Sequence, residues 1–185
     1  MRRTVLLVLL VPLLALAACS RPSDVAPPVA AAAPATASPA PTAAPGLDGD
    51  AAVAAFRGYL REQALAVNAG TADPAAVPGF TATLTPAALS WALPLLADNL
   101  GDRMPGPYPS GVLESRRPAE DRVELRVCLQ DRGWQVDRTS GQTLNAAHHG
   151  TAQVVVVRVD DRWLVDDVVA DGGDCAATDV VPERF

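Results

Sequence analysis

Alternating hydrophobic and polar positions mark the carboxy-terminal half of the chain. In the run 122–130 the aliphatic residues occupy every second position: Val123, Leu125, Val127 and Leu129. This period of two predicts a β-strand with one buried face. A second run, 151–171, contains two β-branched stretches separated by Asp160 and Asp161. It predicts two antiparallel strands joined by a tight turn, because acidic residues tolerate turn conformations.

Helical periodicity comes earlier in the chain. A helix is expected to run to about Ala69, with Asp48 or Asp50 as its N-cap and Gly70 at the left-handed position that follows. Its apolar stripe comprises Val53, Phe56, Leu60, Ala64 and Val67.

A second helix is expected to start at Thr85 and Pro86, a favourable N-cap and first-turn pair, and to stop at Gly101. Pro94 should kink or split it, because proline removes an interior hydrogen bond. The segment 103–111 is expected to be loop, with a short first strand beginning at 112–113.

The amino-terminal segment is expected to direct export. Two arginines precede an apolar run, 5–16, which is shorter than the roughly 20 residues that span a bilayer. The run ends in Leu16-Ala17-Ala18-Cys19, which resembles the lipobox of bacterial lipoproteins. That resemblance implies removal of the signal peptide 1–18, diacylglycerol on the Cys19 thiol, acylation of the new amino terminus, and a lipid anchor in the cell membrane. The alternative is an ordinary cleaved signal with a free Cys19.

Composition divides the remainder into two parts. Residues 19–47 comprise the cysteine and an Ala/Pro-rich segment that cannot form a core, so we expect a disordered tether. Residues 48–185 are expected to form a single domain. After removal of 1–18 the chain carries 13 basic and 21 acidic residues, a formal net charge of −8. Such an acidic chain disfavours nucleic acid as a partner.

The two remaining cysteines test whether residues 131–150 form another strand. If they did, Cys128 and Cys175 would lie at opposite ends of the sheet. If 131–150 is an excursion, strand 122–130 pairs directly with 151–159 and both thiols lie at one end, where a disulfide is feasible. We expect the excursion, and export favours the disulfide. A nucleophilic or metal-binding Cys128 would need a partner at close range.

The order of a helix, a second kinked helix and an antiparallel sheet resembles the nuclear-transport-factor-2-like fold. The residues that carry the resemblance are Phe56, Tyr59-Leu60, the strand 123–129 and the hairpin ending 161–165. The resemblance implies an α+β domain in which amino-terminal helices pack on a strongly curved antiparallel β-sheet, forming a cone. Many exported bacterial lipoproteins of this kind have no assigned activity.

Enzymes of this fold place a general base and an acid or hydrogen-bond donor inside the cone. None of the candidate residues here matches a family catalytic motif: Tyr59, Tyr108, Asp131, Asp137, His148, His149, Asp166 and Asp167. The adjacent histidines would point in opposite directions in an extended segment and are expected to be exposed loop residues. Asp166 and Asp167 are expected on the solvated face near a strand end. No cofactor and no metal are expected.

Two functional hypotheses follow. The first is a membrane-anchored, non-catalytic binding or interaction module of the cell envelope, with an envelope protein as its partner. The second is a binder of a small apolar molecule, or an enzyme, that uses the interior of the cone. A mouth closed by Phe80, Trp91 and Trp163 would favour the first hypothesis. An open cavity with a buried aspartate or histidine would favour the second.

Overall fold

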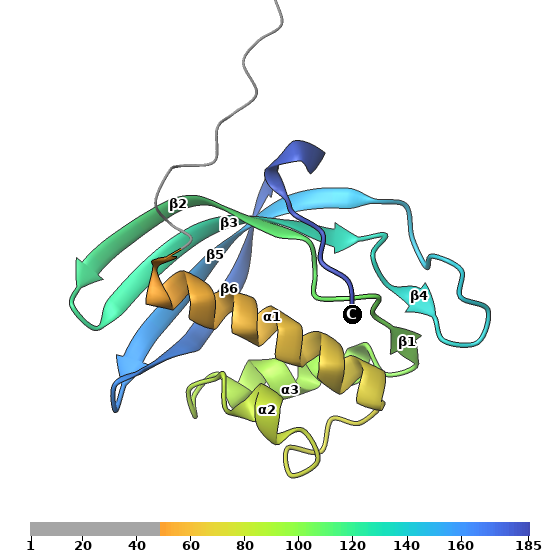
Figure 1. Cartoon of the computed structure of the whole chain (residues 1–185), viewed down its shortest axis with the longest axis horizontal. Coiled ribbons are helices and arrows are strands. Elements are labelled where there is room, and N and C mark those ends of the chain that lie inside the picture. Colours follow the sequence, from red (N-terminus) through yellow and green to blue (C-terminus); the bar gives the residue numbers. More distant parts are fainter. Residues whose placement is uncertain (1–48) are drawn as a thin grey trace, which may run out of the picture. The chain divides into compact units, whose positions relative to one another are not determined.

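The computed structural model describes residues 49–185. Figure 1 shows three helices beside a curved antiparallel sheet, which is the expected α+β architecture. The expected signal peptide, the expected lipobox with Cys19 and the expected tether lie outside the described residues. The elements in chain order are α1 (Ala51–Ala69), α2 (Pro78–Thr81), α3 (Leu89–Asp98), β1 (Asp102–Arg103), β2 (Ser110–Ala119), β3 (Arg122–Arg132), β4 (Val136–Asp137), β5 (His148–Val159), β6 (Arg162–Asp174) and the 3₁₀ turn η2 (Ala177–Asp179).

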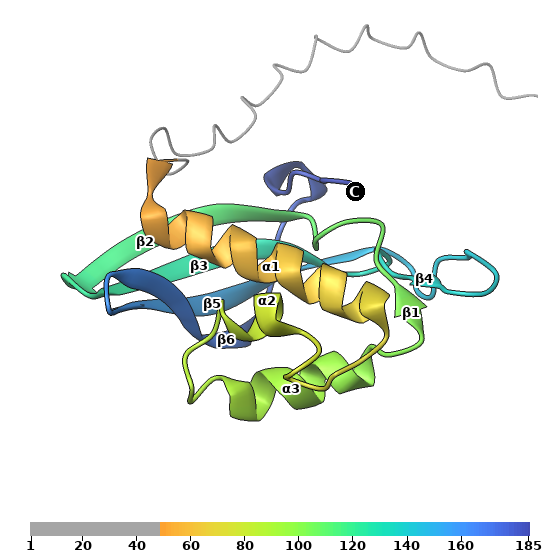
Figure 2. The ribbon, with the colours of Figure 1, turned by 60° about the horizontal axis from the view of Figure 1, so that its bottom comes forward.

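Helix α1 has the caps that the sequence indicates. The Asp50 carboxylate accepts a hydrogen bond from the Ala52 N–H at 2.7 Å, which satisfies one of the unpaired donors of the first turn. At the other end Gly70 has φ 74°, and its N–H donates to the carbonyls of Ala66 and Val67. All five residues of the expected stripe are buried. These residues belong to the core cluster, and Figure 2 shows from a second direction that α1 lies along one face of the sheet.

The main sheet has the strand order β2-β3-β5-β6, with every neighbouring pair antiparallel. Of the four alternating residues of β3, Val123, Leu125 and Val127 are fully buried and Leu129 is partly buried, and Arg126, between two of the buried ones, is also only partly buried. The turn between β5 and β6 is formed by Asp160 and Asp161, with φ 47° and 61°. Positive φ at both central residues is typical of a type I′ hairpin turn. Both strand predictions are therefore confirmed.

The segment 131–150 is an excursion, as expected. β3 pairs directly with β5, with Cys128 opposite Thr151. Within the excursion the short strand β4 pairs with β1, away from the main sheet. The Arg138 guanidinium donates to the carbonyls of Val67, Asn68 and Asp102, so the excursion is fastened to the carboxy-terminal end of α1.

Three expectations need correction. Helix α3 begins at Leu89 rather than at Pro86, although Thr85 Oγ1 does accept a hydrogen bond from the Ala88 N–H. Pro94 lies inside α3 and does not split it. The first long strand, β2, covers ten residues and includes the end of the expected loop, because its pairing with β3 outweighs its weak hydrophobic pattern.

Cys128 and Cys175 lie at the same end of the sheet, with 5.9 Å between their Cα atoms, and form a disulfide. This confirms the expected placement of the two thiols. The bond holds the end of β6 against β3, and the carboxy-terminal tail, 176–185, leaves from this point. The tail runs antiparallel to the start of β2, where the Val181 N–H donates to the Ser110 carbonyl.

Candidate functional site

The interior of the domain is filled by aromatic side chains around Tyr59. This residue of α1 is 2% exposed, and its ring lies 5.8 Å from Phe80 of α2 and 6.3 Å from Trp91 of α3, between centroids. Phe56 stacks on it from the preceding turn at 6.4 Å. Burial raises the pKa of Tyr59, with a smaller contribution from Tyr108, so its hydroxyl stays neutral.

The residues expected at the mouth of the cone pack onto the core in different ways. Phe80 is 1% exposed and belongs to the core, whereas Trp91 and Trp163 are partly buried against it. The Trp91 indole N–H donates to the Asp166 carbonyl oxygen at 3.3 Å. The Trp163 ring is covered by the Arg117 guanidinium, 5.1 Å from its centroid, which is a cation–π contact. All three side chains expected at the mouth of the cone therefore pack on the core.

The polar residues buried within 49–185 are Gln63, Thr85, Gln135 and Thr151, and none of them is an acid or a histidine. Among the acidic candidates from the sequence, Asp166 is in contact with the aromatic cluster, through its backbone carbonyl and Trp91. It lies within β6, half-buried, rather than on a solvated face, and its carboxylate accepts a hydrogen bond from the Thr85 hydroxyl at 2.8 Å. Asp167, beside it, is also half-buried.

Asp131 and His148, which are 17 positions apart in sequence, are brought together at one end of the sheet. His148 Nδ1 lies 2.6 Å from an Asp131 carboxylate oxygen, and its Nε2 lies 3.5 Å from Asp174. Both histidines lie in β5 and are partly buried, so their expected loop position was wrong. The pairing follows from the β3–β5 register, which places Arg132 opposite His148. Sequence spacing alone carries no signal for it.

Asp137 has a local structural role. Its carboxylate accepts hydrogen bonds from the Ser140 N–H at 2.6 Å and the Thr139 N–H at 3.0 Å, and these bonds lower its pKa. This is the turn geometry that aspartate favours. Within residues 49–185 there is no group of three or more ligand-type side chains placed to hold a metal ion. In the same range no helix combines the length and hydrophobicity needed to cross a bilayer.

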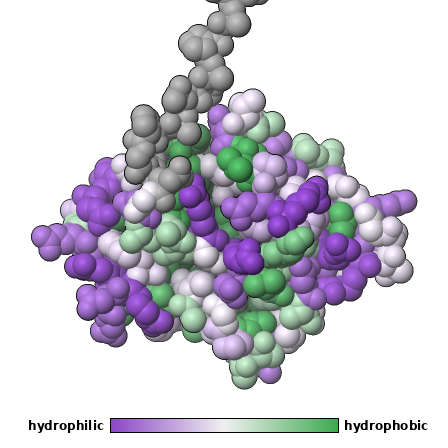
Figure 3. All heavy atoms as spheres, in the orientation of Figure 1, coloured by the Kyte–Doolittle hydropathy of each residue, from purple (hydrophilic) through white to green (hydrophobic). Residues whose placement is uncertain are grey.

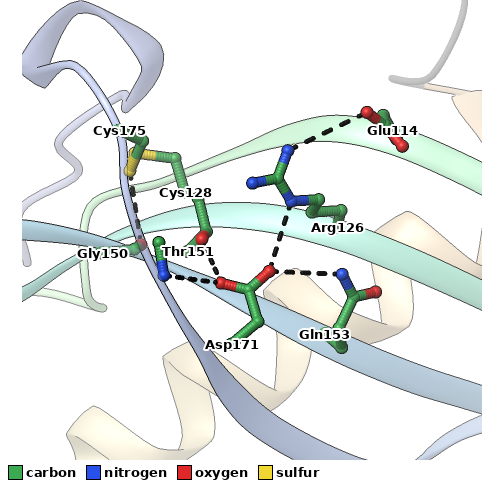
Figure 4. A network of polar contacts seen from close by, with 9 residues as sticks. Glu114, Arg126, Cys128, Gly150, Thr151, Gln153, Asp171 and Cys175 are labelled. Atoms are coloured by element: carbon green, nitrogen blue, oxygen red, sulfur yellow. Dashed lines mark hydrogen bonds and ion pairs between the residues drawn. A yellow bond between two sulfur atoms is a disulfide. The ribbon is translucent and has the colours of Figure 1, made fainter.

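The sheet face opposite the helices carries a network of polar side chains centred on Asp171 (Figure 4). Its carboxylate accepts hydrogen bonds from the Thr151 hydroxyl and, at 3.3 Å each, from Arg126 and Gln153. The Thr151 hydroxyl and then the Gly173 N–H contribute most to lowering the Asp171 pKa to about 2. Arg126 also lies 3.9 Å from Glu114, so the network extends across all four strands.

Tyr108, which is partly buried against the core, lines a pocket between α1, the loop before β2 and the carboxy-terminal tail. The pocket measures about 300 Å³ and is lined by Arg57, Leu60, Pro107, Tyr108, Ser110, Val181 and Glu183. Burial raises the pKa of Tyr108 to about 12, helped by the charges of Asp102 and Asp131. Figure 3 shows this face of the domain, where hydrophilic side chains are interspersed with small hydrophobic areas. Tyr108 was a candidate from the sequence, but its position beside the tail was not predicted.

Comparison with known proteins adds little beyond the fold. No protein-family model matches the chain, and no curated protein matches it. A solved structure, described as an NTF-2-like protein of unknown function from Shewanella oneidensis MR-1, is similar over 62% of this chain and 98% of that one. The two are 15% identical, with a TM-score of 0.39. At this similarity no residue role transfers, and the α+β class rests on the helices and curved sheet described above.

Proposed function

We propose that the chain is a lipid-anchored, extracytoplasmic module of the cell envelope that binds a partner and catalyses no reaction. The observation that carries the proposal is the filled interior around Tyr59, where a cone-shaped enzyme would hold its substrate. A catalytic acid or base needs a reachable position beside the substrate. In the interior of this domain the rings of Tyr59, Phe80 and Trp91 pack against one another and occupy that space.

The lipobox residues support the anchoring half of the proposal. A diacylglycerol group with an additional acyl chain provides the two signals that stable membrane attachment requires. The disulfide between Cys128 and Cys175 is consistent with an oxidising compartment outside the cytoplasm. The partner is expected to be a protein or another component of the envelope.

Fractionation of cells that express the Cys19→Ala variant tests the anchor. We expect the variant in the soluble fraction and the unaltered chain in the membrane fraction. Cys19→Ser is a second variant, because it keeps the size of the side chain and removes only the thiol. Retention of both variants in the membrane would overturn the lipid anchor.

Titration with 1-anilinonaphthalene-8-sulfonate, an anionic fluorescent probe whose aromatic part binds in apolar cavities, tests the filled interior. We expect no saturable binding to the folded protein, because a native core packed to normal density has no room for the probe. Saturable binding to the folded chain contradicts the proposal and favours the alternative, a small apolar-molecule binder or enzyme.

A further inference from the structure

The pocket that contains Tyr108 has one wall formed by the carboxy-terminal tail, and this wall is fixed in place. A Cβ added to Gly106 would lie 2.1 Å from the Glu183 carbonyl oxygen, and one added to Gly111 would lie 1.7 Å from that of Asp179. Only glycine allows such a close backbone approach. Glycines therefore occupy two positions at which the tail packs against the loop before β2 and the start of β2.

Polar and aromatic contacts hold the same tail at its end. The Phe185 N–H donates to the Pro105 carbonyl at 3.0 Å. The Phe185 ring lies under the Arg61 guanidinium at 5.2 Å, and the Arg184 guanidinium lies over Trp134 at 4.9 Å. The disulfide at Cys175 fixes the beginning of the tail. The tail is therefore held at its beginning and at its end, and the pocket lies between these two points of attachment.

The lining combines opposite charges with an apolar surface. Arg57 from α1 and Glu183 from the tail supply one positive and one negative group, and Ser110 supplies a hydroxyl. The apolar part comes from Leu60, Pro107 and Val181, of which Val181 is 70% exposed. Arg57 already has an interaction within the protein. Its guanidinium carries five N–H donors, so it can bind a further acceptor.

From this lining we infer that the pocket binds a short zwitterionic peptide. The peptide carboxylate is recognised by Arg57, its ammonium group by Glu183, and small apolar side chains lie against Leu60, Pro107 and Val181. A volume of about 300 Å³ lies at the lower end of the range for ligand sites, which suits a ligand of a few residues. The inference rests on the proposed function as a binding module and specifies the ligand class and the surface.

Calorimetric titration of the full exported chain in detergent with trialanine tests the inference. Trialanine is expected to bind saturably, and N-acetyl-trialanine and trialanine amide, which each lack one charge, are each expected to bind about two- to fivefold more weakly. These ligand changes test both charges without altering the protein. Equal binding of trialanine and the blocked peptides, or no saturation below about 10 mM, would overturn the inference.

Charge-neutral variants supply the second part of the test. Arg57→Gln and Glu183→Gln are each expected to weaken trialanine binding about two- to fivefold. The matched controls, Arg158→Gln and Glu120→Gln, remove the same charges at exposed positions outside the pocket lining and should bind normally. Arg57 and Glu183 are themselves exposed, so neutralisation leaves the core intact, and a thermal melt verifies this.

Equal weakening by the controls would mean that net charge, and not the pocket, governs binding, and would overturn the inference. If the chain fractionates with the membrane but does not bind the peptide, the inferred peptide site is wrong and the proposed anchor is unaffected. If the chain binds the peptide but is not found in the membrane fraction, the proposed anchor is wrong and the peptide site is unaffected.

Discussion

Tyr59 lies where α1, α2 and α3 meet, and its ring contacts an aromatic residue of each. Replacement with alanine is therefore expected to lower the free energy of unfolding by about 3–5 kcal/mol, through lost burial and the cavity that remains. Tyr59→Phe keeps the ring and is expected to cost less than about 1.5 kcal/mol. Urea denaturation measures both. Phe185→Ala, at a ring 52% exposed, is the matched control and should change stability little. Similar losses for Tyr59→Ala and this control would contradict the central packing role of Tyr59.

Asp171 has a pKa lowered to about 2, chiefly by the hydroxyl of Thr151 and the N–H of Gly173. Because its folded pKa lies below its ordinary value of 3.8, the stability that it contributes is present above pH 4 and is lost as the pH falls towards 2. Asp171→Asn is expected to unfold more easily at pH 5 and to show a smaller further loss between pH 4 and pH 2.

Urea midpoints measured at several pH values in this range check the expectation. Asp98→Asn, at an exposed position on α3, is the matched control and should follow the unaltered chain. An Asp171→Asn variant with the same acid sensitivity as the unaltered chain would show that the network on the outer sheet face does not depend on this carboxylate.

At the scale of elements, Arg138 joins the excursion to the carboxy-terminal end of α1. Its guanidinium donates to the carbonyls of Val67 and Asn68 in the last turn of α1, and a cation at this position interacts favourably with the helix dipole. Arg138→Ala is expected to cost about 1 kcal/mol, since the side chain is exposed to solvent. Denaturation reports the loss, and amide hydrogen exchange should show faster opening of the last turn of α1. Arg132→Ala is the matched control and should leave amide exchange in the last turn of α1 unchanged. Faster exchange of that turn in the Arg132→Ala variant would contradict the specific role of Arg138.

Elements with one strongly buried face were predictable from the sequence. The stripe of α1 and the alternation of β3 follow directly from burial on one side, and the turn at Asp160 follows from local backbone preferences. Strand β2 was underestimated, because its residues 114–119 are all exposed and carry no hydrophobic period. Its pairing with β3 is a tertiary effect that local patterning does not encode.

The candidate site was harder to predict from the sequence than the helices and strands were. Tyr59, Tyr108 and the mouth residues were identified by type, but their grouping depends on which elements the fold brings together. The contact of His148 with Asp131 needs the β3–β5 register, and the pocket at Tyr108 needs the path of the tail. Gly106 and Gly111 were the available signals for that path, since glycine permits close backbone approach.

At the scale of the whole molecule, the disulfide between Cys128 and Cys175 closes a long loop that contains the excursion, β5 and β6. Its loss is expected to lower the free energy of unfolding by about 2–5 kcal/mol, mainly because the cross-link restricts the unfolded chain. Thermal melts with and without reductant measure the effect. Cys128→Ala/Cys175→Ala is the variant that removes the bond permanently and should melt like the reduced chain, irrespective of reductant. An unchanged midpoint on complete reduction would contradict this expectation.

The same disulfide also determines the effect of a proteolytic cut between the two cysteines. Residues 138–147 are all exposed, and they lie between the two cysteines. A single proteolytic cut there would divide the polypeptide, yet the two fragments would stay covalently joined. Every pairing of the four-stranded sheet would also survive, because β2 and β3 lie on one fragment, β5 and β6 on the other, and β3 pairs with β5 across the cut. The domain is thus built so that the integrity of its sheet is independent of the continuity of its backbone at the excursion.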